Sequence, residues 1–461
     1  MKIILFGAGG FLRDNENNIK KLPNTEIVGI VDNNMSVIGT KCLGHIVTDL
    51  ENVKIKFDYV VITSIYAVEI EKQLINSGYD KHIIKRFREY EAFANKENQV
   101  KYVKSEVFCD KKSILAITPI IEYNGACMAL LYVLEQLKKV YNYRVSLISP
   151  KYKDGIMEYV TNKEIEVIVY PNVEFDSNNA WLDNFDYYIV NTLLMRNCLE
   201  FINPKRTIWW LHESESSYVI EQRLWGNLDN KLEKCVHTFC VSKTEKKVFQ
   251  KYVSSVEAEV LEYGLPDAFD SCLYNNKTQD KKTVFAVIGF IAKIKGQDIL
   301  LKAIHKLPPN YLSNCEFWII GDNDDKAFYD DIKSNIYYEN IKLLGGKSHS
   351  ELEVLYKKID VVVSTSRQDS LPIVVTEGFM HRKLCIISDV IGTTEYVEDG
   401  VHALFFKSED DSELAEKICY ALDHKDEMKK VAENGRKIYE KYFSIEQVGK
   451  KFNSIFMEMN I

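Results

Sequence analysis

Short apolar runs rich in β-branched residues alternate with helix-like stretches along nearly all of the 461-residue chain. Runs such as Lys2–Phe6, Tyr187–Asn191 and Ile359–Val363 lack polar alternation, which is the pattern of a strand buried on both faces. Strands separated by helices pair in parallel, because parallel neighbours need a crossover connection. The alternation therefore predicts an α/β protein, and its length predicts two to three domains.

Breaks in this alternation divide the chain into three units. The boundaries that we predict are a small Rossmann-like unit at 1–90, a linker at 91–112, an α/β unit at 113–270, a linker at 271–282, an α/β unit at 283–440 and a final helix at 441–461. The second linker is predicted because that segment is polar and poor in strand formers. Two α/β units of similar size joined by a linker predict a ligand-binding cleft between them.

The segment after Ile359–Val363 places two acids around the start of a helix. A polar turn leads to Pro372, which tolerates the first helical position because that position needs no N–H. Asp369 then lies at the carboxyl end of a strand, where ligands bind in open sheets, and Glu377 lies inside the helix. Two acids at this spacing also arise by chance among 67 acidic residues. Their placement around an anion-favouring helix start is what indicates a site for a sugar nucleotide.

A second segment, Gly289–Asp298, also follows a strand and precedes a helix. It carries Lys293, Lys295 and Gly296. Cations are mildly unfavourable at a helix start, so a bound anion is favoured over a purely solvated lysine pair. This segment therefore supports a phosphate-bearing ligand.

The two segments resemble the donor-binding domain of retaining glycosyltransferases of family 4, the glycosyl transferases group 1. Asp369 and Glu377 hold the spacing of that family's Glu-x7-Glu motif, with Asp in place of the first Glu. Lys295 and Gly296 match the second half of its Gly-Arg…Lys-Gly pattern, but Phe290 stands where Arg is usual. The resemblance covers residues 113–459 and implies a GT-B fold, in which two Rossmann-like domains enclose a cleft.

The resemblance also implies a role for each site residue. Asp369, Lys295 and His212 would form the catalytic centre, with Lys295 stabilising the charge of the leaving diphosphate. A packed core histidine is an equal alternative for His212. Glu377 would accept hydrogen bonds from the ribose, and Lys293 would replace the missing Arg. The other donor-binding residues that the resemblance implies are Ser370, Leu371, Pro372, Ile373, Gly289, Gly125, Gly345, Thr394 and Glu395.

The first unit carries a partial dinucleotide-binding pattern. Gly7 and Gly9 follow the first strand and Asp32 follows the second, but Leu12 replaces the third glycine of the fingerprint. The unit is similar to small Rossmann-like domains attached to sugar acetyltransferases and other polysaccharide enzymes. Asp32 either holds ribose hydroxyls or caps its turn, and we expect a nucleotide-binding relic with a regulatory or packing use.

Composition narrows the class of protein. Hydrophobic residues make up 46% and charged residues 27%, as in ordinary soluble proteins, and the net charge of −8 argues against a nucleic-acid binder. The ten cysteines form no C-x-x-C pair, so we expect free thiols. The first apolar run leads into a glycine turn, which favours a strand over a signal peptide, and no run has transmembrane length. We expect a cytoplasmic protein and leave open a peripheral contact with the inner face of the membrane.

The predicted function is transfer of a sugar, with retention of configuration, from a UDP- or GDP-sugar to a glycan, lipid-linked or protein acceptor. Surface polysaccharide or glycoconjugate biosynthesis is the expected setting, and neither a metal ion nor a cofactor besides the donor is expected. The Phe290 and Asp369 departures keep a second hypothesis open, a non-catalytic nucleotide-sugar-binding partner subunit. An oxidoreductase driven by the first unit ranks third.

Overall fold

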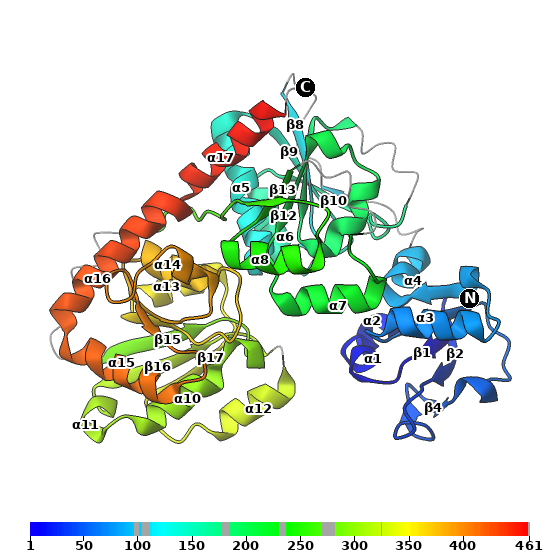
Figure 1. Ribbon diagram of the computed structural model, residues 1–461, viewed down its shortest axis with the longest axis horizontal. Coiled ribbons are helices and arrows are strands. Elements are labelled where there is room, and N and C mark those ends of the chain that lie inside the picture. The colour runs from blue at the N-terminus through cyan, green and yellow to red at the C-terminus, as the bar shows by residue number, and fades with distance from the viewer. Residues whose placement is uncertain are drawn as a thin grey trace.

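The computed structural model describes residues 1–95, 101–103, 111–176, 184–229, 237–269, 282–323 and 325–459. Three sheets follow one another along the chain, each covered by helices (Figure 1). Most of the predicted linker 271–282 and the middle of the predicted linker 91–112 lie outside the described residues. Within the described ranges, no helix is long and apolar enough to span a membrane.

The N-terminal domain is built on a six-stranded sheet with the order β3-β4-β2-β1-β5-β6. Its strands are β1 (Lys2–Phe6), β2 (Glu26–Val31), β3 (Lys41–Cys42), β4 (His45–Thr48), β5 (Tyr59–Ile62) and β6 (Ile84–Arg86). Its helices are α1 (Gly10–Asp14), α2 (Glu16–Lys20), α3 (Ala67–Asn76) and α4 (Phe87–Ala94). Leu5 and Phe6 point into apolar clusters on opposite faces of the sheet, as successive strand residues must.

The middle domain has an eight-stranded sheet with the order β14-β13-β12-β11-β8-β9-β10-β7. Its strands are β7 (Lys101–Val103), β8 (Ser113–Ile117), β9 (Arg144–Ser149), β10 (Glu166–Val169), β11 (Tyr187–Asn191), β12 (Thr207–Leu211), β13 (His237–Cys240) and β14 (Ala258–Val260). Its helices are α5 (Gly125–Tyr141), α6 (Ile156–Asn162), α7 (Glu215–Trp225) and α8 (Lys243–Tyr252). Only β7 runs antiparallel, against β10, among the described strands of this sheet.

One predicted boundary in this region changes. The segment 91–112 is not only a linker, because it contains the end of α4 and strand β7. Strand β8 ends at Ile117, and Pro119 just beyond it has no N–H to donate to a ladder.

The C-terminal domain has a parallel six-stranded sheet with the order β17-β16-β15-β18-β19-β20. Its strands are β15 (Thr283–Ile288), β16 (Cys315–Ile320), β17 (Ile341–Gly345), β18 (Val361–Ser364), β19 (Leu384–Ser388) and β20 (Leu404–Phe406). Its helices are α10 (Gln297–Lys306), α11 (Pro309–Leu312), α12 (Lys326–Ser334), α13 (His349–Tyr356), α14 (Ile373–Met380), α15 (Asp411–Asp423) and α16 (Lys425–Ile438).

The chain then returns to the middle domain through its last helix. A π-helical turn at Tyr439–Phe443 follows α16, and α17 (Ile445–Glu458) begins where the Ser444 side chain accepts a hydrogen bond from the backbone N–H of Gln447. Figure 1 shows this helix in red, running along α5. The Tyr143 hydroxyl donates to Asn453 over 3.1 Å, which fixes the helix on the middle domain. The last helix, which follows the C-terminal domain in the chain, therefore packs on the middle domain.

Candidate active site

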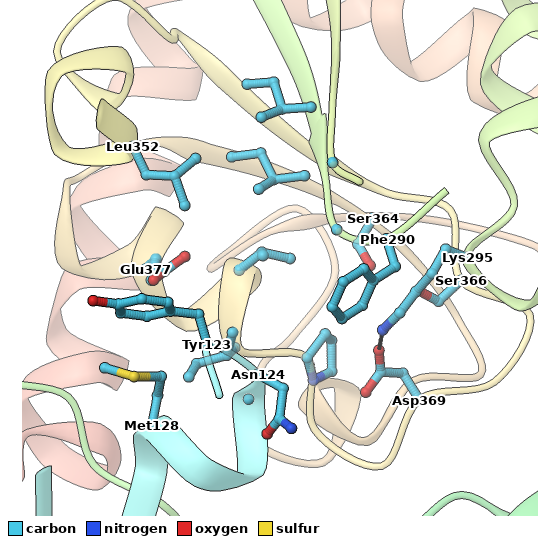
Figure 2. Close-up of a pocket in the computed structure, with 18 of the residues that line it drawn as sticks. Tyr123, Asn124, Met128, Phe290, Lys295, Leu352, Ser364, Ser366, Asp369 and Glu377 are labelled. Carbon is cyan, nitrogen blue, oxygen red and sulfur yellow. Dashed lines mark hydrogen bonds and ion pairs between the residues drawn. The ribbon is translucent and has the colours of Figure 1, made fainter. Parts of the chain in front are cut away.

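A cavity of about 340 Å³ lies between the middle and C-terminal domains (Figure 2). Its walls are loops that follow the carboxyl ends of β8, β12, β15 and β18, together with the start of α14. Parallel strands bring these loops to one edge of each sheet, which is where α/β proteins bind ligands. The topology alone thus gathers side chains that are far apart in the sequence.

The charged centre of the cavity is an ion pair between Lys295 and Asp369. The Lys295 ammonium lies 2.6 Å from the Asp369 carboxylate, as Figure 2 shows. Gly296 allows this approach: its φ is +71°, and a Cβ there would lie 2.2 Å from the Thr365 carbonyl oxygen. The Thr365 hydroxyl also donates to the Lys295 carbonyl over 2.9 Å. Close packing of two strand-end turns therefore sets the position of the lysine.

Glu377 lies on the other side of the cavity from this pair (Figure 2). Its carboxylate accepts a hydrogen bond of 2.7 Å from the Tyr356 hydroxyl. Loss of water around the carboxylate raises the pKa of Glu377 to about 7, although the Tyr356 hydrogen bond opposes this rise. The side chain is thus a strong hydrogen-bond acceptor whose charge changes near neutral pH.

His212 follows β12 and reaches the cavity from the middle domain. Burial lowers the pKa of its imidazole to about 3, so the ring is neutral at ordinary pH. Its Nε2 is buried and has no hydrogen-bond partner within the described part of the chain. A buried polar atom without a partner is unfavourable, and the ring also packs edge-on against Trp210, so the ligand role of His212 stays a prediction beside the packed core alternative. The His212 carbonyl accepts from the Ser370 hydroxyl over 2.7 Å, which ties the two domains together beside it.

Two helix starts also face the cavity. Helix α5 begins at Gly125 and is capped by the Asn124 side chain, which accepts from the Cys127 N–H over 2.9 Å. A Cβ at Gly125 would meet nothing within 4 Å, so the loop leaves open space at this wall. Helix α14 begins directly after Pro372. Both starts present free backbone N–H groups and favour an anion between them.

The structure brings together many of the predicted site residues, but not all. The members that line the cavity are Asp369, Lys295, His212, Glu377, Ser370, Leu371, Pro372, Ile373, Gly289 and Gly125. The members that do not line it are Lys293, Gly345, Thr394 and Glu395.

The side chain of Glu395 is used elsewhere in the fold. It accepts from the Lys243 N–H over 2.7 Å and from the Thr244 hydroxyl over 2.6 Å, so it caps helix α8. The Thr394 hydroxyl donates to the Ile391 carbonyl within its own turn. The structure gives neither residue a contact with the donor cavity.

The replacement of the missing Arg by Lys293 is not supported either. Its carbonyl accepts from Arg367 over 2.5 Å, and its side chain is not part of the cavity wall. Lys347, after β17, is the second lysine that lines the cavity. Its signal in the sequence was a lysine directly after the glycine pair Gly345-Gly346 at a strand end.

Tyr356 is the other residue that the sequence did not reveal. It lies on α13 with its ring buried, and only the fold places its hydroxyl beside Glu377. A buried tyrosine on an amphipathic helix carries no signal that separates this role from core packing. No group of three His, Cys, Asp or Glu side chains suited to a metal occurs in the ranges that the structure describes.

The partial dinucleotide pattern of the N-terminal domain forms a closed turn. Asp32 accepts from the Ala8 N–H over 2.6 Å and from the Asn34 N–H over 2.7 Å, so both its oxygens bind backbone. Gly7 has a φ of +119°, and a Cβ there would lie 2.7 Å from the Thr63 carbonyl oxygen. Gly9 has open space around it. Of the two alternatives for Asp32, the geometry favours the turn cap.

Comparison with known proteins agrees with this architecture. Residues 274–438 match the family model of glycosyl transferases group 1, and residues 1–84 match the model described as C2185-like, N-terminal. The structure of HepE from Anabaena in complex with UDP-glucose superposes with a TM-score of 0.65 at 17% identity, covering 75% of this chain and 99% of that one. The two larger domains have the GT-B fold.

Two relatives match part of the chain by sequence. An uncharacterised glycosyltransferase of Methanocaldococcus jannaschii is 30% identical over 176 residues, which is 38% of this chain and 47% of that protein. The alpha-D-kanosaminyltransferase of Streptomyces kanamyceticus is 24% identical over 183 residues, which is 40% of this chain and 47% of that protein. The chain thus spans about half the length of these relatives.

Proposed function

We propose that this protein is a glycosyltransferase that moves a sugar from a nucleotide-sugar donor to an acceptor hydroxyl. The observation that carries the proposal is one cavity with the Lys295–Asp369 pair on one side and Glu377 on the other. The match of the C-terminal domain to glycosyl transferases group 1 supports a sugar donor. The UDP-glucose bound by HepE, which shares the fold, supports a UDP-sugar over a GDP-sugar.

The donor would bind with its ribose at Glu377 and its sugar at the Lys295–Asp369 side of the cavity. Glu377 would accept hydrogen bonds from the ribose hydroxyls, and the starts of α5 and α14 would hold the diphosphate. The transferred sugar would then lie beside His212 and Asp369, which both line the cavity. Each end of the ligand thereby meets the side chain that its chemistry requires.

Lys295 is the group that would assist bond breakage. When the bond between the anomeric carbon and the diphosphate oxygen breaks, negative charge gathers on the diphosphate, and an ammonium group placed there stabilises it. In the structure this ammonium is paired with Asp369, so a diphosphate would share or take over the lysine. The diphosphate is already negative before the bond breaks, so only the part of this stabilisation that grows in the transition state lowers the barrier.

We further propose retention of configuration, as in family 4. The acceptor oxygen would attack the anomeric carbon from the face that the diphosphate leaves, and the departing phosphate oxygen would take the acceptor's proton. One carbon–oxygen bond breaks, one forms, and the proton moves between the two oxygens. The match of the C-terminal domain to glycosyl transferases group 1 supports this route.

The alternative function is a nucleotide-sugar-binding subunit without activity, and Phe290 in the place of the usual Arg favours it. A screen of UDP- and GDP-sugars by thermal shift and by nucleotide release separates the two functions. Saturation at 100 times Kd stabilises the fold by about 2.7 kcal/mol. We expect one donor to stabilise the full chain and to be hydrolysed slowly. Binding without turnover, even with sugar acceptors present, would support the subunit, and absence of any binding would overturn both functions.

A further inference from the structure

A second and larger cavity, of about 940 Å³, opens onto the catalytic end of the first. The residues that line both cavities are Asn124, Gly125, Ala126, His212, Phe290, Lys295, Asp369 and Ser370. In the proposed donor orientation, these shared residues surround the anomeric carbon. A molecule in the second cavity would therefore reach the carbon that is attacked.

The outer wall of this second cavity comes from the N-terminal domain. Helix α4 contributes Arg88, Glu91 and Ala92 to its lining, and Asn95 directly after the helix also lines it. Figure 1 shows α4 at the junction between the N-terminal and middle domains. The cavity thus lies between three domains, and the GT-B part alone would leave it without this wall.

Helix α4 is held firmly against the middle domain by Arg88. Its guanidinium forms ion pairs with Glu174 and, over 3.1 Å, with Glu221, and it donates to the Leu194 carbonyl over 2.6 Å. Both glutamates are buried, so removing Arg88 would leave buried charges without a partner. This anchoring fixes the position of Glu91 one helical turn further along.

Glu91 faces the cavity with a carboxylate that accepts no hydrogen bond from any residue in the described ranges. Partial burial raises its pKa, while the positive charge of Lys151 opposes that rise. Lys151 is exposed and lies in the loop after β9, which lines the same cavity. The wall therefore offers an unused acceptor and a nearby donor to a ligand.

Apolar surface completes the lining. Phe175 is partly exposed to the cavity, and its ring stacks on Trp225 behind it, with centroids 5.9 Å apart. Pro119, Pro150 and Pro171 add flat apolar faces. Carboxylates and ammonium groups bind hydroxyls, whereas aromatic and proline faces pack against the C–H faces of sugar rings. A volume near the upper end of the 300–1,000 Å³ of typical ligand sites leaves room for more than one ring.

We propose that this cavity is the acceptor site, that its occupant is an oligosaccharide-type acceptor, and that α4 supplies an acceptor-binding residue, Glu91. The proposal rests on the proposed function and deepens it. It also assigns a role to the N-terminal domain. Asp32 of this domain binds backbone N–H groups of its own turn, and the domain would contribute to function through α4, which lines the acceptor cavity.

The test uses the full chain with its donor and measures acceptor use in variants. The probes are maltotetraose, chitotetraose and p-nitrophenyl glycosides of glucose, galactose, N-acetylglucosamine and N-acetylgalactosamine. We expect Glu91→Gln and Lys151→Met to raise the KM of the acceptor that is used by about tenfold, because the first makes a charge-assisted hydrogen bond neutral and the second removes a charged donor. The Kd of the donor, measured by calorimetry, should stay at its original value in both variants.

Glu51→Gln is the matched control, since Glu51 is an exposed acid of the same domain that lines neither cavity. It should leave the acceptor KM unchanged. A second measurement is hydrogen exchange in α4: the acceptor should slow exchange at 87–94 when added with UDP, and UDP alone should not. Slowed exchange would support the proposal independently of any variant.

Three results would overturn it. An acceptor KM that is the same in Glu91→Gln as in the original chain removes Glu91 from the site. A chain that hydrolyses its donor but neither binds nor glycosylates any of the six probes contradicts an oligosaccharide-type occupant. A chain that binds no nucleotide-sugar fails at the donor step, which overturns the proposed function itself and this proposal with it.

Discussion

The N-terminal and C-terminal domains share a pattern, a glycine turn after one central strand and an acid after another, but they use it differently. In the N-terminal domain both oxygens of Asp32 bind backbone N–H groups of Ala8 and Asn34. In the C-terminal domain Asp369 pairs with the ammonium of Lys295 and lines the cavity. An acid bound to backbone amides completes the fold of its own turn. An acid that is paired with a side-chain cation at a cavity wall can exchange that partner for a ligand.

The largest expected effect concerns the Lys295–Asp369 pair of the C-terminal domain, which lines the cavity. Lys295→Ala should lower the transfer rate by about 100- to 1,000-fold, the usual loss when one charge-stabilising donor is removed. Steady-state kinetics at saturating donor would measure it. Lys293→Ala is the matched control, because it removes a lysine two positions away that does not line the cavity. Equal losses in both variants would contradict a specific role for Lys295.

Gly296 tests how the lysine is held. Gly296→Ala places a methyl group 2.2 Å from the Thr365 carbonyl oxygen at a residue whose φ is +71°. We expect the free energy of unfolding to fall by at least about 2 kcal/mol, from backbone strain and from this overlap. Gly9→Ala in the N-terminal glycine turn should be nearly neutral, because nothing lies within 4 Å of the new Cβ. Chemical denaturation of both variants gives the comparison, and a neutral Gly296→Ala would show that the turn can relax.

A variant of Asp32 tests whether the acid of the N-terminal domain stabilises its own turn. Asp32→Ala should cost about 1–3 kcal/mol of stability, since the Ala8 and Asn34 N–H groups both lose their acceptor. The Kd of the nucleotide-sugar should not change. Calorimetric binding and thermal unfolding on one preparation would measure both quantities. A loss of nucleotide binding in this variant would reopen the ribose alternative for Asp32.

The sequence predicted the buried strands well and the connections between domains poorly. Lys2–Phe6 and Tyr187–Asn191 are strands at their predicted bounds, because a run buried on both faces carries a local signal. Strand β7 was missed, since three residues at the edge of a sheet are specified by their partner β10 rather than by their own pattern. The wall formed by α4 depends on which face of one domain docks on another, and no local pattern encodes that.

The candidate site also contains residues that a local sequence pattern predicts and residues whose position depends on the folded protein. Asp369, Glu377 and Lys295 lie on one cavity because strand ends converge wherever the sheet is parallel, which the alternation predicts. Lys293 and Glu395 were assigned by position in a loop, and loop side chains point where hydrogen bonds of the folded protein direct them. Glu395 caps α8 from another domain, a partner that is 151 residues away in the sequence.

Glu377 should make donor binding depend on pH. Burial raises the pKa of Glu377 to about 7, and ribose hydroxyls donate to its ionised form, so donor binding favours higher pH. Between pH 8 and pH 6 the ionised fraction falls by about tenfold, and the donor Kd should rise by about the same factor. Glu377→Gln should remove this dependence. A pH dependence of the donor Kd that survives in Glu377→Gln would contradict this role of Glu377.

Tyr356→Phe has the smallest expected effect, and it tests one hydrogen bond alone. It removes the hydroxyl that donates to Glu377 over 2.7 Å and leaves the packed ring in place. That hydrogen bond holds the pKa of Glu377 down, so its loss should move the midpoint of the donor Kd profile to higher pH and weaken binding at pH 7 by about threefold. The free energy of unfolding should fall by about 1 kcal/mol.

The same variant changes how stability depends on pH, and the sign follows from linkage. Because the folded pKa of Glu377 lies above its ordinary value of 4.5, its contribution to stability is full below that value and is lost as pH rises through about 7. Tyr356→Phe raises the folded pKa further, so the total loss of stability between pH 5 and pH 8 should become larger. Tyr337→Phe, at an exposed tyrosine, is the control that should leave both profiles unchanged. If Tyr356→Phe also leaves the midpoint of the Kd profile in place, Glu377 does not control donor binding, and the acid of the C-terminal domain would serve its fold as Asp32 serves the other.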